Sequence, residues 1–437
     1  MYGLLIILTV SYPLSAAPIT LKKAVETLEK DSFTLKISKR RSDQAKVRIR
    51  KAWSAVFPKV DLDVEQVHND LKGTRRLSTS VDLGAQTTDS LNLAPIDAKR
   101  VRLSLTQVLF DKKIPTQLKL GAVDYEIADY EYQHVKQEQL LALVQAYYAI
   151  ANILKLKRLA DHDVAVLEKN LVEIKNKNVL NLHTKEDVLK VEVDLSKSKQ
   201  NLLEQQQKLR LAKYTLNHIL GRDSREAIDI QEDALNPVFH LDISDSLGAL
   251  ETAWEKRPDF LKLLKEKERI ELQIQLQKDT LWPIVSANSN YGYTNKNRFS
   301  LSEKNRDWSW TVGGSMRLFN GFDTLATMDE YELKLDEIRL QIELKKQDIK
   351  SEINEALYAM QLAQQRQRDA VINTQLADER VSVTKGKYEE KQATQLDIVL
   401  MENQYHEAKT QEAMARYELA GAVAQFKYAI GRNPAQL

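Results

Sequence analysis

The chain has 437 residues, of which 64 are basic and 62 acidic, so its formal net charge is only +2. This balance argues against a general nucleic-acid-binding protein, which would show a basic excess. Charged residues make up 29% of the chain, which excludes a bundle of membrane-spanning helices. The absence of cysteine excludes disulfides, thiolate nucleophiles and cysteine-based metal sites.

An apolar run, Gly3–Ala17, opens the chain. It is too short to span a bilayer and fits the apolar region of a secretory signal, with small residues at its end near a cleavage point. Two features are unusual: no Lys or Arg precedes the run, and Pro18 would directly follow a cut at Ala17. We predict a signal peptide at residues 1–17, with a buried N-terminal segment as the alternative.

The first half of the chain predicts helices around a pair of strands. The first helix should begin at Thr20, its N-cap, and end before Pro58, because the residue preceding a proline leaves the α region. Strands are predicted where apolar and polar residues alternate. In chain order the expected elements are a helix at 20–53, a strand at 60–65, a polar loop at 68–99, a strand at 100–111, a long helix at 114–179, a turn at 180–183 and a returning helix at 187–220.

The returning helix occurs twice. Apolar or small residues recur at alternating steps of three and four, which is the seam of a coiled coil, and the same seam returns 210 residues further along the chain. One polar interruption falls in each seam, at Gln205 and at Glu412. Both copies end in Gly-Arg, the glycine being a C-cap signal. The first seam contains Val188, Val191, Leu195, Ser198, Leu202, Leu209, Ala212, Leu216 and Ile219, and the second contains Ile398, Met401, Tyr405, Ala408, Ala415, Leu419, Ala422, Phe426 and Ala429.

The second half repeats the order of elements, so the chain is interpreted as a tandem duplication. Its expected elements are a helix at 246–280, a strand at 284–294, a short polar loop to 307, a strand at 308–318, a long helix at 323–389 and a returning helix from 397. The predicted division is a first repeat at 18–222, a linker at 223–245 and a second repeat at 246–437. The fold class is mainly α with a small β part.

The strands indicate an assembly of several chains. Four strands with one apolar face cannot close into a barrel, and within lipid no open sheet edge is tolerated. Eight strands from a dimer would be filled by side chains, whereas twelve from a trimer could leave a lumen. Long helices of about 100 Å favour a layered cylinder beside such a barrel. A soluble sandwich is the alternative. The expected inward polar residues are Asp61, Asp63, Glu65, Arg102 and Arg317, and the expected membrane-interface aromatics are Tyr291, Tyr293, Trp308 and Trp310.

Several motifs resemble the TolC family of outer-membrane efflux proteins. They are the duplicated order of elements, Leu109-Phe110-Asp111 with Leu318-Phe319-Asn320, and Lys387-Tyr388 followed by Thr394–Val399. The resemblance covers nearly the whole chain after the signal. It implies a homotrimer with a twelve-stranded barrel in the outer membrane of a Gram-negative bacterium, continued by an α-barrel of twelve helices in the periplasm. It also implies a passive exit duct that works with a periplasmic adaptor and an inner-membrane pump.

The resemblance further implies that the two helix-hairpin tips form the periplasmic gate and contact the adaptor. The gate residues would be Asp187, Tyr388, Asp397 and Leu400, where Asp187 and Tyr388 match a link between hairpins and Asp397 matches an aspartate ring. Leu400 stands where the family has a second aspartate ring, and Ala393 stands where it has an arginine. The adaptor contacts would be Asn181, Leu182, Thr184, Lys391, Gln392 and Thr394. Lys391 departs from the glycine usual in this turn.

The charge of three Asp397 copies near a threefold axis would favour cations. The alternative is that Asp187 and Asp397 are N-caps of the returning helices, and the two roles can coexist. The seven histidines show no metal-ligand spacing, and no phosphate loop or nucleophile elbow is present. We therefore expect no enzyme, no metal and no cofactor. The alternative function is a non-membrane coiled-coil scaffold. If the protein is a duct, the sequence does not distinguish between drug efflux, metal efflux and type I secretion.

Overall fold

The computed structural model describes residues 18–69, 75–76, 90–91, 96–180, 184–231, 246–296, 303–393 and 395–436. The predicted signal peptide and much of the predicted loop and linker lie outside these residues. Two compact units can be distinguished, and each draws residues from both halves of the chain. One comprises the described parts of Met1–Ser42, Ile127–Leu264 and Leu340–Leu437, and the other comprises those of Asp43–Glu126 and Lys265–Arg339.

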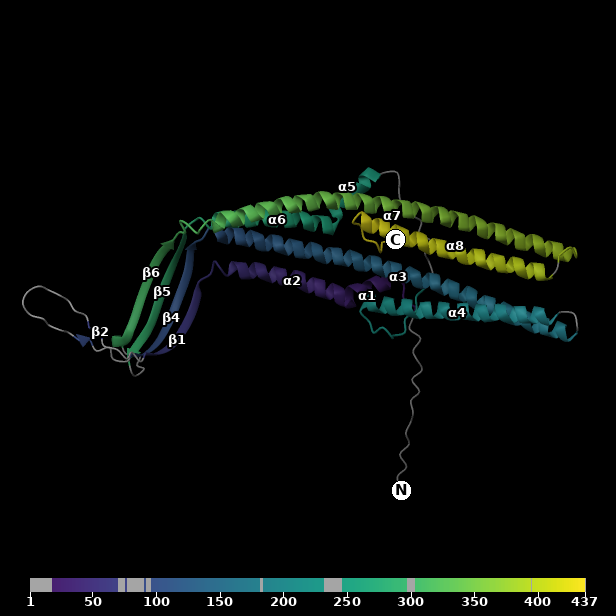
Figure 1. The fold of residues 1–437 in the computed structure, drawn as a ribbon, viewed down its shortest axis with the longest axis horizontal. Helices are drawn as coiled ribbons and strands as arrows, with labels where there is room; N and C mark the ends of the chain where they lie inside the picture. The colour runs from purple at the N-terminus through teal and green to yellow at the C-terminus, as the bar shows by residue number, and fades with distance from the viewer. Residues whose placement is uncertain are drawn as a thin grey trace, which may run out of the picture. The chain divides into compact units, whose positions relative to one another are not determined.

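In the described part of the first half, two short helices precede the strands and two longer helices follow them. Figure 1 shows the returning helix α4 running back along the long helix α3. The bounds are α1 Leu21–Asp31, α2 Phe33–Trp53, β1 Lys59–Asn69, β2 Arg75–Arg76, β3 Ser90–Leu91, β4 Ile96–Phe110, α3 Lys113–Val179 and α4 Lys185–Leu220. Thr20 is the N-cap of α1, as predicted, and its hydroxyl accepts a hydrogen bond from the Lys23 amide at 3.3 Å.

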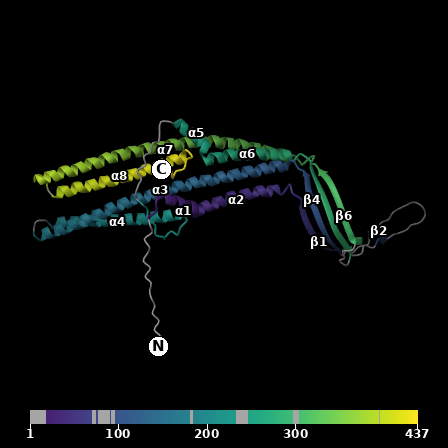
Figure 2. The same ribbon diagram turned by 180° about the vertical axis from the view of Figure 1, so that it is seen from behind.

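The second half repeats this order. Its returning helix α8 lies along its long helix α7 in both views (Figures 1 and 2). The bounds are α5 Ser246–Lys256, α6 Pro258–Asp279, β5 Ile284–Lys296, a 3-10 turn η1 Glu303–Asn305, β6 Arg306–Ser315, α7 Asp323–Glu389 and α8 Gln395–Ala429. Both long helices contain 67 residues, about 100 Å at ~1.5 Å per residue. The predicted fold class, mainly α with long paired helices and four longer strands, is confirmed.

The predicted seams are buried, so the hairpins pack as the periodicity indicates. In the first half, Leu143 and Ile150 of α3 join Leu216 of α4 in one core cluster. In the second half, Ile353 and Met360 of α7 join Leu419 and Phe426 of α8 in another. The two clusters use matching seam positions, and the first also includes Tyr417, Ala420 and Ala424 of α8, so it joins the two halves of the chain.

The short helices before the strands are each broken, contrary to the single helix predicted in each half. The first break falls at Ser32 and the second at Arg257, ahead of Pro258. At the second break, Pro258 disfavours the α region for Arg257. At both breaks a returning helix also approaches closely. A Cβ on Gly221 would lie 2.6 Å from the Asp31 carbonyl oxygen, and one on Gly431 would lie 2.8 Å from the Arg257 nitrogen. The end of each returning helix therefore abuts the break.

The four longer strands form one antiparallel sheet in the order β1-β4-β5-β6. Figure 1 shows them side by side. The register pairs Leu62 with Leu103, Leu103 with Tyr291, and Tyr291 with Trp308. The last strand was predicted to continue to Leu318, but β6 ends at Ser315 because pairing with β5 stops where β5 begins, at Ile284.

Candidate functional site

The sheet carries an apolar face whose side chains are largely exposed. Paired residues of antiparallel strands point to the same side, so the register places the apolar positions of all four strands on one face. Leu62 is 66% exposed, Trp308 is 69% exposed and Trp310 is 70% exposed. This face contains Val60, Leu62, Val64, Val101, Leu103, Leu105, Tyr291, Tyr293, Trp308, Trp310 and Val312.

The four predicted interface aromatics all belong to that face. Tyr291 and Tyr293 stack edge to face with ring centroids 5.9 Å apart, and their hydroxyls are 3.2 Å apart. Trp308 pairs with Tyr291 across the strands, while Trp310 pairs with Ser289. An indole or phenol ring that is apolar in its body and polar at its edge suits the boundary between lipid and water.

The opposite face of the sheet is polar. Asp61, Ser104 and Asn290 share one row, and Asp63 and Arg102 share the next. The Arg100 guanidinium lies 3.4 Å from the Glu65 carboxylate. The residues predicted to face inward thus gather on one side, with the exception of Arg317. Arg317 lies beyond the end of β6, so its predicted place in a strand is wrong.

The sheet has two edges whose backbone groups have no strand partner within the described residues. β1 pairs only with β4, and β6 pairs only with β5. An edge strand exposes a row of amide and carbonyl groups that can pair with another chain. The described sheet is therefore open at both edges.

The tip of the first hairpin begins α4 with a capping box. The Thr184 hydroxyl accepts a hydrogen bond from the Asp187 amide at 3.2 Å, and the Asp187 carboxylate accepts one from the Thr184 amide at 2.9 Å. The proposed N-cap role of Asp187 is therefore wrong: Thr184 is the N-cap, and Asp187 is the third residue of the helix, where a carboxylate satisfies free amides. Asn181 and Leu182 lie outside the described residues.

The tip of the second hairpin ends α7 in a strained turn. Lys391 has a φ of 59°, in the left-handed region that favours glycine. Its amide donates to the Tyr388 carbonyl at 3.0 Å, and the Gln392 amide donates to the Lys387 carbonyl at 2.7 Å. This is the Schellman pattern of a helix C-terminus, with lysine at the position where glycine is usual.

The remaining predicted tip residues lie at the start of α8. Asp397 is the third residue of that helix and is half-buried, so the helix bounds exclude it as the N-cap. Its place matches that of Asp187 in α4, 210 residues earlier. Leu400 and Tyr388 are exposed. Thr394 lies outside the described residues.

An ion pair ties the two arms of each hairpin near its tip, and it recurs at the same offset. The Lys175 ammonium lies 2.7 Å from the Glu192 carboxylate in the first hairpin. The Lys385 ammonium lies 2.9 Å from the Glu402 carboxylate in the second. Both pairs are solvated and therefore contribute little stability, about 0 to 1 kcal/mol each. The same side-chain contact is therefore present in both hairpins, in addition to the same helical backbone.

A buried ionic cluster at Arg257 was not found from the sequence. Its guanidinium side chain is only 4% exposed and reaches Asp259 at 2.8 Å, Glu352, and the Ala429 carbonyl oxygen at 3.1 Å. Burial raises the pKa of Asp259, but the hydrogen bonds and charges of Arg257 and Lys345 outweigh this effect and hold the pKa of that carboxyl well below its ordinary value. The signal available was Arg-Pro-Asp at 257–259, where a proline marks the first residue of a helix.

No described part of the chain gathers three histidine, aspartate or glutamate side chains in an arrangement that could hold a metal ion. The candidate functional features are two surfaces: the two-faced sheet and the pair of hairpin tips. The two-faced sheet can shape a boundary between lipid and water.

Comparison with known proteins relates this fold to channels of the outer membrane. The family model described as outer membrane efflux protein matches residues 249–432, which lie in the second half of the chain and make up less than half of its length. The resemblance to outer-membrane efflux proteins inferred from the motifs is therefore confirmed as a resemblance. No curated protein sequence matches the chain significantly.

Solved structures share the fold over almost the whole chain. The Campylobacter jejuni CmeC outer membrane channel is 14% identical, with 94% of this chain and 85% of that chain covered and a TM-score of 0.75. The Vibrio cholerae outer membrane protein VceC is 16% identical, with 94% and 96% covered and a TM-score of 0.70. The open state of the Neisseria gonorrhoeae MtrE outer membrane channel is 13% identical, with 94% and 89% covered and a TM-score of 0.70.

Proposed function

We propose that three copies of this chain form one duct across the outer membrane and the periplasm. The observation that carries the proposal is the open four-stranded sheet with an exposed apolar face, a polar face and two unpaired edges. Three such sheets joined edge to edge would give a twelve-stranded barrel, in which lipid covers the apolar face and water fills the polar side. A non-membrane scaffold would leave that apolar face in water.

The helices would continue the duct into the periplasm. Exposed apolar side chains follow α7 over its whole length, including Leu333, Leu340, Tyr358 and Ile372. A solvated helix seldom carries so many, so neighbouring copies would cover them and close an α-barrel. The two repeats of each chain would then contribute structurally similar segments to the wall of the α-barrel, as expected for the proposed tandem duplication at 18–222 and 246–437.

The duct would be passive and would depend on partners for energy. We propose that a periplasmic adaptor contacts the hairpin tips at Asn181, Leu182, Thr184, Lys391, Gln392 and Thr394, and that an inner-membrane pump delivers the substrate. Asp187, Tyr388, Asp397 and Leu400 would form the gate. The exposure of Tyr388 and Leu400 supports this assignment, because exposed tip residues are available to neighbouring hairpins.

A pair of matched substitutions in one strand tests the barrel. Leu103→Arg places a cation on the apolar face, and Ser104→Arg places the same cation on the polar face. A cation facing lipid costs about 2–4 kcal/mol near the middle of a bilayer, whereas the lumen tolerates it. We expect Leu103→Arg to lose outer-membrane trimers and Ser104→Arg to keep them, as measured by the mass of the detergent-solubilised protein. A wild-type protein that is monomeric in mild detergent would contradict the duct.

The gate is tested separately in planar bilayers. Three Asp397 carboxylates near the axis would favour cations, so Asp397→Ala should lower cation selectivity. Asp187→Ala is the comparison variant. It removes the gate aspartate at the same helix position of the first hairpin, which is assigned to a link between hairpins and not to the ring, so a loss of cation selectivity confined to Asp397→Ala would assign the effect to the ring. Unchanged selectivity in Asp397→Ala would reject the ring while leaving the trimeric duct intact.

A further inference from the structure

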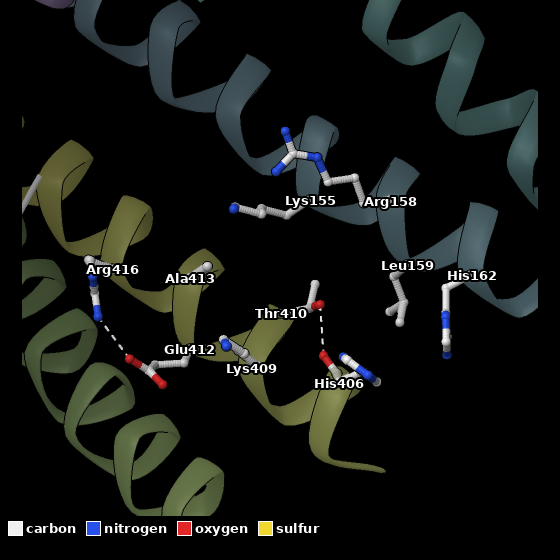
Figure 3. Close-up of a pocket in the computed structure, with 10 residues that line it drawn as sticks. All are labelled: Lys155, Arg158, Leu159, His162, His406, Lys409, Thr410, Glu412, Ala413 and Arg416. Atoms are coloured by element: carbon white, nitrogen blue, oxygen red, sulfur yellow. Dashed lines mark hydrogen bonds and ion pairs between the residues drawn. The ribbon is translucent and has the colours of Figure 1, made fainter. Parts of the chain in front are cut away.

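A cavity of about 360 Å³ lies between α3 and α8, which come from different halves of the chain. Figure 3 shows the residues that line it. Those from α3 are Lys155, Arg158, Leu159 and His162, and those from α8 are His406, Lys409, Thr410, Glu412, Ala413 and Arg416. None of them belongs to the sheet or to the hairpin tips, so the function proposed above gives this cavity no role.

The lining is strongly cationic. Two permanent cations come from each helix, Lys155 and Arg158 on α3 and Lys409 and Arg416 on α8. The only carboxylate among the lining residues is that of Glu412, which accepts a hydrogen bond from Arg416 at 2.8 Å (Figure 3). The lining therefore contains four permanent cations and one carboxylate. Like charges around one cavity raise the potential inside it and attract anions.

Two histidines form one end of the lining. The ring centroids of His162 and His406 are 5.0 Å apart, and the His162 Nε2 atom lies 3.1 Å from the Asn403 Oδ1 atom. The Thr410 hydroxyl donates to the His406 carbonyl oxygen at 2.9 Å, which holds its side chain against α8. Cationic side chains, two imidazole rings and the Thr410 hydroxyl thus line a space whose apolar contacts are Leu159 and Ala413. The donor set fits anionic oxygens.

We propose that this cavity binds a small polyanion of the phosphate or polycarboxylate class, one for each chain. Its volume is that of a small-molecule site and cannot accommodate a helix of a partner protein. Arginine binds such oxygens through a planar fork and lysine as a point charge, so cations on both helices could engage one ligand together. A bound polyanion would bridge the two repeats and stabilise their packing by mass action.

Titration calorimetry on the purified full-length protein in detergent tests the site, with inorganic pyrophosphate and citrate as probes. The double substitution Arg158→Gln, Lys409→Gln removes one cation from each wall. The matched control Lys169→Gln, Lys197→Gln removes the same charge from exposed positions that do not line the cavity. We expect saturable binding at one site per chain, weakened at least about tenfold by the first pair and unchanged by the second, because each charge-assisted contact is worth about tenfold or more.

The other outcomes are distinct. Absence of saturable binding to the wild-type protein would overturn the proposal, and so would equal weakening by both pairs, since that reports only general charge. Hexaglutamate serves as a probe for an acidic protein segment, and its binding without any binding of pyrophosphate or citrate would also overturn it. The proposal does not depend on the duct, because trimer formation and bilayer conductance are measured without these probes.

Discussion

The ends of the two returning helices show the same backbone joint built from different side chains. Gly221 and Gly431 both have a φ of 73°, and both close a Schellman turn against the break between two short helices. At the first joint the residue at the break is a buried serine, Ser32, and at the second it is Arg257 with its ionic partners. Both joints therefore keep the glycine that the left-handed backbone conformation requires. The side chain at the break differs between the two joints, and the groups that surround it differ accordingly.

The largest effect should come from removing the guanidinium at the second joint. Arg257→Leu leaves Asp259 and the Ala429 carbonyl without their main partner, and breaking a buried ion pair costs about 3–5 kcal/mol. Ser32→Ala at the first joint should cost about 1 kcal/mol or less. The free energy of local opening, measured by hydrogen exchange at the C-terminus of α8 and of α4, compares the two joints. Equal costs would show that the ionic cluster adds nothing to the backbone joint.

Low pH should destabilise the second joint more than the first. The folded pKa of Asp259 is below its ordinary value, so its contribution to stability is complete above about pH 4 and is lost as the pH falls below that value. Asp259→Asn removes this dependence, because an amide does not titrate. We expect the melting temperature of the wild-type protein to fall more than that of the variant between pH 5 and pH 3. Parallel curves for the two proteins would contradict the role of Asp259.

The glycines should be equally intolerant of a side chain at both joints. A Cβ at Gly221 or Gly431 would meet backbone atoms within 3 Å, and an L-residue pays about 1–2 kcal/mol in the left-handed region. We therefore expect Gly221→Ala and Gly431→Ala each to cost about 2 kcal/mol or more, measured as the fall in the midpoint of thermal unfolding. Gly386→Ala, where a Cβ meets nothing within 4 Å, is the control and should be nearly neutral or stabilising. A tolerated alanine at one joint only would show that the two backbones differ.

The sequence predicted the elements with strong periodicity and missed features that depend on contact. Heptad seams and alternating strands predicted α3, α7 and the two-faced sheet, because burial repeats with the period of the element. The break at Ser32 has no local breaker, since the approach of Gly221 from another helix causes it. The cationic cavity likewise exists only because α3 and α8 lie side by side, which no pattern within one helix could show.

The tips were predicted in part. The repeat offset correctly placed Asp187 and Asp397 at matching positions, but the alternative that these aspartates are N-caps is wrong for Asp187, since Thr184 is the N-cap. The pattern Thr-x-x-Asp at 184–187 is the spacing of a capping box and would have placed the helix start three residues earlier. The strained conformation of Lys391 was signalled by the departure from the glycine usual in the family resemblance.

The capping box of the first tip should be worth less than either joint. Thr184→Ala removes the hydroxyl that accepts from the Asp187 amide, and losing an N-cap costs about 1 kcal/mol. Thr184→Ser keeps the acceptor and should be close to neutral. Hydrogen exchange of the first amides of α4 measures the effect. Identical protection in the alanine and serine variants would show that the cap does not stabilise this helix start.

The smallest effect should be a gain, at the second tip. Lys391→Gly relieves a non-glycine residue of its left-handed conformation, worth about 1–2 kcal/mol, and loses part of this to the greater entropy of glycine in the unfolded chain. A net stabilisation of about 0.5–1 kcal/mol should appear as slower hydrogen exchange of two backbone amides, the one at position 391 and that of Gln392. The hydrogen bonds of these amides close the turn. Lys391→Ala keeps the strain while removing the charge, so it should give no such gain. If alanine stabilised the turn as much as glycine, the charge of the Lys391 side chain, and not the backbone conformation, would be the source of the strain. This turn would then resemble the joints at Gly221 and Gly431 only in its hydrogen bonds.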